Sequence, residues 1–146
     1  MQLPPEASRL LREQKLCVLC TSAQDLPHAS LMAFTYLPEE KVVIFATRRE
    51  TTKSENITRN PRVALLVFGG IEEAGVSLSC TIEGTAHFVP DAQAEVYRAV
   101  HHRRHPNLPS FTEESDVAFV RVVFDRVTLA DKQDRVRVFP GCEGTG

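Results

Sequence analysis

The chain has 146 residues, of which 42% are hydrophobic, and its formal net charge is −2. A chain of this size and composition forms a single domain whose core can fold without disulfides or metals. Its slight negative charge argues against a nucleic-acid binder, which carries a basic excess to replace phosphate counterions.

No segment has the pattern of a signal peptide, and no apolar run reaches the roughly 18 residues of a membrane-spanning helix. The cysteines are too few and too scattered for a disulfide framework; they are Cys17, Cys20, Cys80 and Cys142. We therefore expect a cytoplasmic protein with reduced thiols and no membrane partner.

The first predicted element is a short amphipathic helix that ends near Lys15, with an apolar stripe of Ala7, Leu10 and Leu11. Three β-like runs follow it, over residues 16–21, 28–37 and 41–47. The connections between these runs are too short for crossovers, so the strands must pair antiparallel.

The pattern then changes from strand to helix. Thr52 stands three residues before Glu55, which predicts a capping box for a helix whose first residue is Lys53. Asn60 and Pro61 stop this helix after about two turns.

The rest of the chain predicts more strands and one further helix. The strands cover residues 62–68, 76–89, 117–131 and 136–139. Gly84 marks a bulge or a barrel corner in the second of them. The helix is capped by Asp91 and runs to about His105, after which Pro106 and Pro109 open a loop.

These elements predict a mainly β fold, a closed or nearly closed antiparallel barrel of about six strands with three short helices inserted. We expect residues 1–140 to form this single domain and residues 141–146 to be a flexible C-terminal tail. No internal repeat or low-complexity linker divides the chain.

A phosphate-sized anion site is predicted where the run FATRRETTKSEN joins a strand to a helix. The free backbone N–H groups after Thr52 would point outward together with the ammonium group of Lys53. Side chains that can add hydrogen bonds or charge are Thr47, Thr51, Arg48 and Arg49. The same pattern also fits a plain capped helix with a solvated lysine, and spacing alone does not choose between the two.

The longer run FATRRETTKSENITRNPRVALLVF resembles the pyridoxamine 5'-phosphate oxidase-like, FMN-binding split-barrel superfamily. There, a strand ending in aromatic-x-Thr is followed by a Ser-Arg-Lys-type turn, a short helix and Asn-Pro. The positions in register are Phe45, Thr47, Lys53, Asn60 and Pro61. Upstream, LPHASLMAF resembles the strand beneath the flavin ring, and downstream, TIEGTAHFV resembles the ladder strand that ends in Glu-Gly. The resemblance spans about residues 10–130, and AEVYRAVHHRRHPNLPSF is closest to an uncharacterised branch of small split-barrel proteins.

The resemblance implies a six-stranded antiparallel split β-barrel that forms a homodimer with FMN at the interface. It implies a flavin-dependent oxidoreductase with a small-molecule redox substrate, in which the flavin itself transfers the hydride or electrons and no catalytic side chain or metal is needed. The implied cofactor-binding residues are Ser30, Leu31, Met32, Ala46, Thr47, Arg48, Thr52, Lys53 and Ser79.

The sequence departs from the family at cationic positions. Ser30 stands where the oxidases have a phosphate-binding arginine, Thr35 where they have a lysine, and Thr52 where the turn has an arginine. A charge-assisted hydrogen bond contributes about 1.5–3 kcal/mol, so one loss weakens FMN binding roughly ten- to a hundredfold unless Arg48 or Arg49 substitutes.

The C-terminal Arg-Leu-type pair that grips pyridoxine in the true oxidases is also missing, because the tail is DRVRVFPG. We therefore expect no oxidation of vitamin B6. The alternative to a flavin enzyme is a non-catalytic barrel that has lost tight FMN affinity, or one that binds haem or a deazaflavin.

Two further patterns have simpler explanations. Cys17 and Cys20 form a C-x-x-C within a strand, where residues three apart point to opposite faces, so we expect neither a disulfide nor a shared metal. His101 and His105 have the spacing of zinc-binding helices, but Pro106 breaks the turn and we predict no metal site. A basic cluster on that helix is either solvated or attracts an anion; it comprises Arg98, His102, Arg103 and Arg104.

Overall fold

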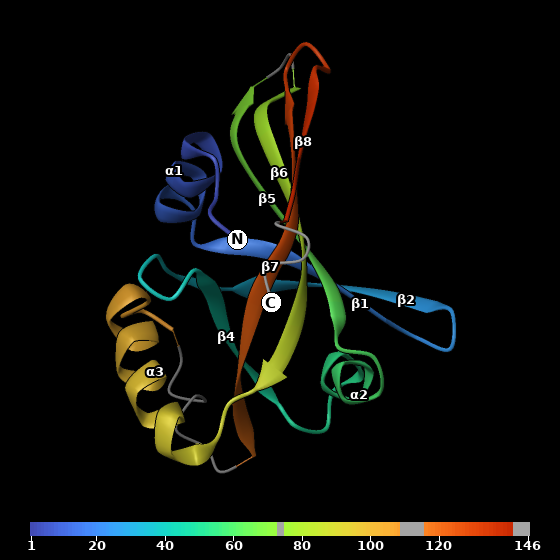
Figure 1. The fold of residues 1–146 in the computed structure, drawn as a ribbon. Coiled ribbons are helices and arrows are strands. Elements are labelled where there is room, and N and C mark those ends of the chain that lie inside the picture. The colour runs from blue at the N-terminus through green and yellow to red at the C-terminus, as the bar shows by residue number, and fades with distance from the viewer. Residues whose placement is uncertain (73–74, 109–115, 142–146) are drawn as a thin grey trace.

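The computed structural model describes residues 1–72, 75–108 and 116–141, which form one curled antiparallel sheet with helices around it (Figure 1). The helices are α1 (Pro5–Glu13), α2 (Thr52–Arg59) and α3 (Asp91–Arg104). The strands are β1 (Leu16–Ala23), β2 (Leu26–Ala33), β3 (Thr35–Leu37), β4 (Val42–Arg48), β5 (Arg62–Glu72), β6 (Gly75–Phe88), β7 (Val117–Asp131) and β8 (Val136–Pro140). Within these ranges, no helix is long and apolar enough to span a membrane.

The strands are hydrogen-bonded in the order β2-β1-β5-β6-β7-β4-β3, and β8 pairs with the second half of β7. All of these pairs are antiparallel. The register of β6 against β7 shifts between Glu83 and Gly84, which is the predicted bulge. A Cβ on Gly84 would lie 2.4 Å from the carbonyl oxygen of Val123, so the close approach of β7 requires glycine there.

Strand β4 is the element that links the barrel to the site. Its side chains are buried on both faces, as its unbroken apolar run predicts. Val43 and Phe45 belong to the core inside the curled sheet, whereas Ile44 and Ala46 pack in a second core with residues of α3. Helix α3 therefore covers the outer face of β4, and Figure 1 shows the two side by side.

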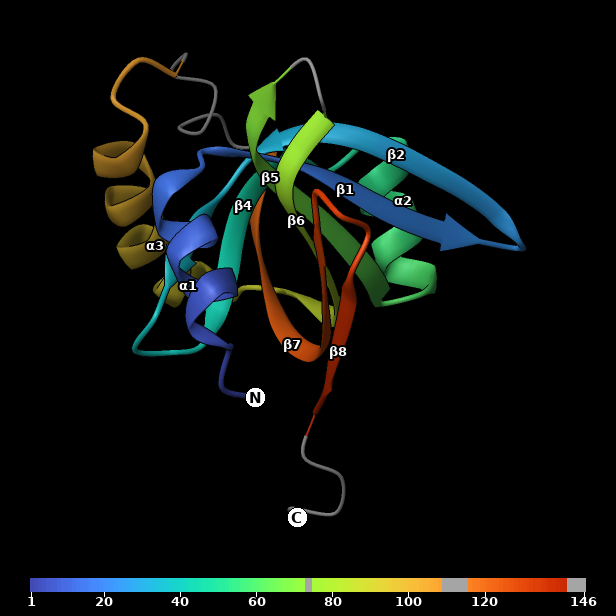
Figure 2. The same cartoon turned by 90° about the horizontal axis from the view of Figure 1, so that it is seen from above.

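The hairpin of β1 and β2 projects beyond the rest of the sheet, as Figure 2 shows. Strand β2 pairs only with β1 among the described strands, so its other edge is open. On this strand Leu26 is 70% exposed and Leu31 is 69% exposed. Helix α2 packs against the hairpin, chiefly against β1, where Asn56 Nδ2 donates to Thr21 Oγ1 at 3.1 Å.

The mainly β antiparallel split-barrel fold with three helices is confirmed, and the described residues form eight strands where about six were predicted. The predicted strand 28–37 divides at Phe34, whose N–H donates to the carbonyl of Lys15 at 3.1 Å. After this residue the chain leaves β1 and pairs with β4. A short-range pattern cannot show this change of partner.

Two helix caps differ from the predictions. The N-cap of α2 is Thr51, one residue before the predicted Thr52, and Asp91 is the first residue of α3 after an N-cap at Pro90. Of the predicted loop, Pro109 lies outside the described residues. So do Cys142 and residues 142–146 of the predicted tail.

Candidate functional site

A cavity of about 330 Å³ lies where the ends of β2 and β4 meet the N-terminus of α2 and one face of α3. We call it the α2 cavity. Its lining residues are Leu31, Met32, Ala33, Ala46, Thr47, Arg48, Thr51, Lys53, His101 and Leu108. Most of these residues belong to strand and helix ends, where some backbone N–H and C=O groups make no hydrogen bond within the sheet or helix.

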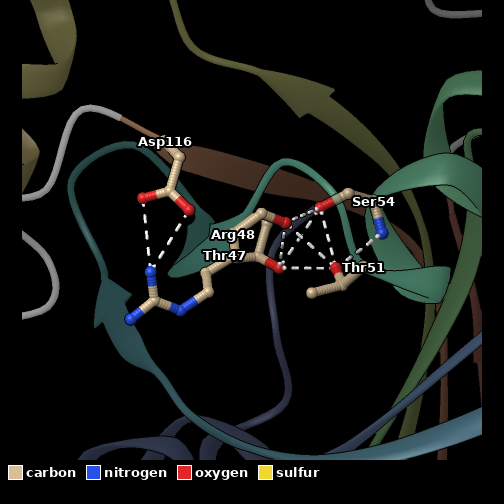
Figure 3. A network of polar contacts seen from close by, with 5 residues as sticks. All are labelled: Thr47, Arg48, Thr51, Ser54 and Asp116. Atoms are coloured by element: carbon tan, nitrogen blue, oxygen red, sulfur yellow. Dashed lines mark hydrogen bonds and ion pairs between the residues drawn. The ribbon is translucent and has the colours of Figure 1, made fainter.

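Hydroxyl groups fix the turn between β4 and α2 (Figure 3). Thr51 Oγ1 accepts from the Ser54 N–H at 3.3 Å and donates to the Arg48 carbonyl at 3.0 Å. Ser54 Oγ donates to the same carbonyl at 2.6 Å, and Thr47 Oγ1 lies 3.2 Å from Ser54 Oγ. Thr51 therefore performs the capping that Thr52 was predicted to perform, and the buried Thr47 supports it from the strand.

The start of α2 presents donors to the cavity. The first intrahelical bond runs from the Glu55 N–H to the Thr51 carbonyl at 3.0 Å, so the N–H groups of Thr52 and Lys53 precede the helix ladder. The half-buried Lys53 lines the cavity, and no carboxylate within the described ranges pairs with its ammonium group. A cation beside a helix N-terminus is a suitable site for an anion such as a phosphate.

An ion pair lies at the rim of the cavity. Arg48 Nη1 lies 3.3 Å from Asp116 Oδ1 and 3.2 Å from Asp116 Oδ2, and the Arg49 N–H donates to the Asp116 carbonyl at 2.8 Å. These contacts tie the end of β4 to the residue before β7. The two side chains are 43% and 49% exposed, so the pair contributes little to stability, and the carboxylate of Asp116 offsets the charge of Arg48.

Helix α3 supplies His101, a cavity residue that the sequence did not single out for ligand binding. The Tyr97 hydroxyl donates to Glu40 Oε1 at 2.7 Å and holds the helix over β4. His101 is only 2% exposed, and its Nδ1 lies 2.8 Å from Thr35 Oγ1. Burial, and then the neighbouring His105 and His102, lower the pKa of His101 from 6.5 to about 4, so its ring is neutral at physiological pH.

The two histidines of the zinc-like spacing have other partners. His105 Nε2 lies 2.7 Å from the Phe34 carbonyl oxygen, and the rings of His101 and His105 are tilted by 53° with centroids 4.7 Å apart. Among the residues described, no cluster of three metal-ligating side chains occurs. One sequence signal for the inward position of His101 exists, because it follows Ala94 and Tyr97 at helical spacing on the buried face of α3.

The cysteines behave as the strand geometry predicts. Cys17 is buried on the inner face of β1, whereas Cys20 is half-buried on the other face, and both are free thiols. Burial raises the pKa of Cys17 and of Cys80 to about 12, which makes both thiols poor nucleophiles. Neither residue lines the α2 cavity.

The α2 cavity brings together six of the nine residues predicted to bind the cofactor; these are Leu31, Met32, Ala46, Thr47, Arg48 and Lys53. Ser30, Thr52 and Ser79 are not among its lining residues. Thr52 is exposed on the first turn of α2, and Ser79 lies on β6 opposite Ala130 of β7. Ser30 Oγ is buried with no hydrogen-bond partner in the part of the chain that the structure describes.

A larger groove, of about 970 Å³, runs between the N-terminus, β7 and β8. Three of its four charged lining side chains are paired, since Arg62 Nη1 lies 3.8 Å from Asp125 Oδ2 and Arg126 pairs with Glu83 at 3.5 Å; the fourth is Lys41. No helix N-terminus opens into it among the described elements. The α2 cavity is therefore the better candidate for an anionic ligand, although it is smaller.

Comparison with known proteins agrees with this geometry. The family model described as pyridoxamine 5'-phosphate oxidase matches residues 3–131. A Schizosaccharomyces pombe pyridoxamine 5'-phosphate oxidase homolog is 27% identical over an alignment covering 90% of this chain and 87% of that protein.

Two solved structures share the fold. A haem-binding protein from Mycobacterium smegmatis has a TM-score of 0.79 at 17% identity, covering 95% of this chain and 60% of that one. An FAD-binding protein from Mesorhizobium loti has a TM-score of 0.68 at 17% identity, covering 87% of this chain and 94% of that one. At these identities the likeness shows the split-barrel fold alone.

Proposed function

The chain belongs to the pyridoxamine 5'-phosphate oxidase family, and on that premise we propose that it binds FMN in the α2 cavity as a flavin-dependent oxidoreductase. One observation carries the proposal: strand ends and a helix N-terminus line one cavity together with six of the nine residues predicted to bind the cofactor. A volume of about 330 Å³ falls at the lower end of the range of ligand sites, about 300–1,000 Å³.

The residues present suit the two halves of the cofactor. Lys53 and the first N–H groups of α2 would hold the phosphate, and Arg48 would add charge at the rim. The apolar side chains of Leu31, Met32 and Ala46 would lie against the flavin ring. The orphaned hydroxyl of Ser30, one residue before this lining, would gain a partner from the ligand or from a second chain.

The bound flavin would supply the hydride or electron transfer. The protein would bind and orient it and exclude water from the ring. Arg48 is held by Asp116, and Thr51 and Ser54 keep the turn closed, so the phosphate site is formed before the ligand arrives. Such preorganisation lowers the entropy lost on binding.

We propose that the protein is a homodimer whose partner completes the cavity. The open edge of β2 and the exposed Leu26 and Leu31 support this, because long apolar edges are usually covered in soluble proteins. Leu31 also lines the α2 cavity, so a second chain on the face of β2 that carries Leu31 would cover the ligand. The free thiols of Cys17, Cys20 and Cys80 support a reducing compartment, and we propose the cytoplasm.

We propose a substrate other than vitamin B6. Lys53 of the cavity lies at the start of α2 and Arg48 is paired with Asp116, whereas the uncharged Thr35 is buried against His101. Arg135 pairs with Asp131 at 3.0 Å, and Arg137 pairs with Glu6. Neither Arg135 nor Arg137 lines the cavity, so among the described residues a second phosphate would find no further cation there.

One observation favours a second candidate, a deazaflavin whose phosphate is a diester. Because Asp116 already offsets the charge of Arg48, Lys53 supplies most of the positive charge available to a phosphate in the cavity. A diester carries one negative charge, whereas the FMN phosphate carries close to two near neutral pH. The diester would therefore suit this weakly cationic site, whether or not the barrel is catalytic.

The test is the visible spectrum of the purified protein before and after incubation with FMN and removal of unbound ligand by gel filtration. Retained flavin absorption, at a stoichiometry near one per chain, is the expected result. A protein that releases all FMN would overturn the FMN assignment. If the protein retains a deazaflavin, or is purified with a haem spectrum, we would instead assign it as a barrel that binds that ligand.

A further inference from the structure

The two ends of the α2 cavity differ in charge. Lys53 lies on the first turn of α2, and Arg48 lies at the rim, where it pairs with Asp116. Helix α3 contributes the neutral His101, and the neighbouring Leu108 also lines the cavity. The ring of His101 is fixed from three sides: by Thr35 at 2.8 Å, by Phe119 in an edge-on contact at 5.8 Å and by His105. Such a ring has one orientation and can present one polar atom to a ligand.

The contact with Thr35 determines which ring nitrogen carries the proton. Thr35 is 4% exposed, and its hydroxyl has no partner other than His101 within the described ranges. A buried hydroxyl needs an acceptor for its proton, and only the unprotonated Nδ1 of His101 can serve. The Thr35 O–H therefore donates to Nδ1, and the ring proton lies on Nε2.

Nε2 is the polar atom left for a ligand. No partner for it occurs in the described part of the chain, and it is not among the fully enclosed unpaired atoms there. The groups around the ring are Phe119, His105 at 4.7 Å, the adjacent His102, and Arg98 above the Phe119 ring. None of them is a carboxylate that would favour a charged imidazole.

We propose that His101, aligned by Thr35, donates a hydrogen bond from Nε2 to an uncharged carbonyl oxygen of the molecule held at the α3 end of the cavity. We infer a neutral carbonyl group there rather than a phosphate or carboxylate, because α3 contributes no cationic side chain to the described lining of the cavity. This inference rests on the proposed function. The carbonyl belongs either to the flavin ring or to a substrate lying beside it.

The first measurement is NMR of the full chain with ¹⁵N-labelled histidine at neutral pH. We expect the His101 signals of a ring protonated at Nε2 and unprotonated at Nδ1. The conservative variant Thr35→Ser should keep this tautomer, whereas Thr35→Val should give a mixture. A wild-type ring protonated at Nδ1 would overturn the inference.

The second measurement compares His101→Phe with His102→Phe, a matched change at an exposed neighbour. If the flavin ring supplies the carbonyl, His101→Phe should weaken FMN and riboflavin by the same factor, about 2- to 10-fold for one neutral hydrogen bond. If a substrate supplies it, FMN affinity should stay constant. Nicotinamide, a neutral carbonyl probe, should then shift the His101 Nε2 signal of FMN-loaded wild type and bind the variant correspondingly more weakly.

Unchanged flavin affinity together with an unmoved Nε2 signal would refute the inference. Its failure is separable from that of the proposed function, which depends on Lys53. If Lys53→Ala leaves FMN binding intact while His101→Phe weakens both flavins, the phosphate assignment fails and the His101 assignment stands. If wild type binds no flavin, titration of the protein with nicotinamide decides the question: a shift at Nε2 supports the role of His101, and no shift rejects it.

Discussion

Arg48 Nη1 lies 3.2 Å from Asp116 Oδ2, and this contact sets the charge at the rim of the α2 cavity. Asp116→Asn removes the negative charge and leaves the guanidinium. We expect FMN affinity to rise by about 2- to 5-fold at low salt and the gain to shrink as salt is added, since both groups are partly exposed.

Isothermal titration with FMN at two salt concentrations measures this effect. Asp125→Asn, which removes a carboxylate of the other groove, is the control and should leave FMN affinity unchanged. Weaker binding by Asp116→Asn would mean that orienting Arg48 matters more than the charge that Asp116 adds.

The buried histidine predicts how stability depends on pH. His101 has a pKa of about 4 in the folded protein against 6.5 ordinarily, so the unfolded chain binds more protons between these values. Stability is therefore full above about pH 6.5 and is lost as pH falls toward 4, by on the order of 3 kcal/mol. The lowered pKa of His105 acts in the same direction.

Urea unfolding at several pH values between 7.5 and 5 checks this prediction. His101→Phe should be less stable at neutral pH, but its stability should fall less steeply with acidification. His102→Phe should keep the wild-type slope, because His102 is exposed. Equal slopes in wild type and His101→Phe would show that His101 does not titrate as described.

Much of the fold could be predicted from local patterns. The apolar run of β4 and the helix signals of α2 identified two of the elements that line the α2 cavity, because strand and helix periodicity are short-range properties. The residue that caps α2 could not be predicted in this way, since Thr51 and Thr52 are neighbours with the same side chain. The choice depends on hydrogen bonds from Thr51 and Ser54 to the Arg48 carbonyl, which exist only in the folded turn.

The α3 side of the site was beyond prediction from local patterns. Thr35 and His101 are 66 residues apart in the sequence, and nothing in either segment indicates the other. The division of the predicted strand at Phe34 has the same origin, because Thr35 turns away from β1 only to pair with Ile44 of β4. Tertiary pairing therefore decides both which strand Thr35 joins and which histidine it contacts.

Glycine at the bulge is predicted to be essential for packing. In Gly84→Ala the new methyl group would lie 2.4 Å from the Val123 carbonyl oxygen, and relief requires a backbone shift in β7. We expect a loss of about 1–3 kcal/mol in the free energy of unfolding. Gly69→Ala, whose nearest neighbour is the movable Gln14 side chain at 2.9 Å, should cost less, and equal losses in denaturant unfolding would contradict this explanation.

The dimer proposal can be tested without touching the cavity lining. Leu26→Lys places a charge on the open edge of β2, and we expect sedimentation to show a shift from dimer to monomer together with weaker FMN binding. Val96→Lys is the control, because Val96 is 61% exposed on α3, away from this edge. A monomeric wild type, or a Leu26→Lys dimer with normal affinity, would exclude the open edge of β2 as the interface.

The central claim is that Lys53 binds the FMN phosphate. Calorimetric titrations of the protein with FMN and, separately, with riboflavin test it most directly. Lys53→Ala should weaken FMN binding by roughly 10- to 100-fold, because a charge-assisted hydrogen bond is lost, and should leave riboflavin binding unchanged. Lys132→Ala, at an exposed lysine after β7, should bind both ligands like wild type. Equal FMN affinity in wild type and Lys53→Ala would contradict the assignment of the phosphate to the start of α2.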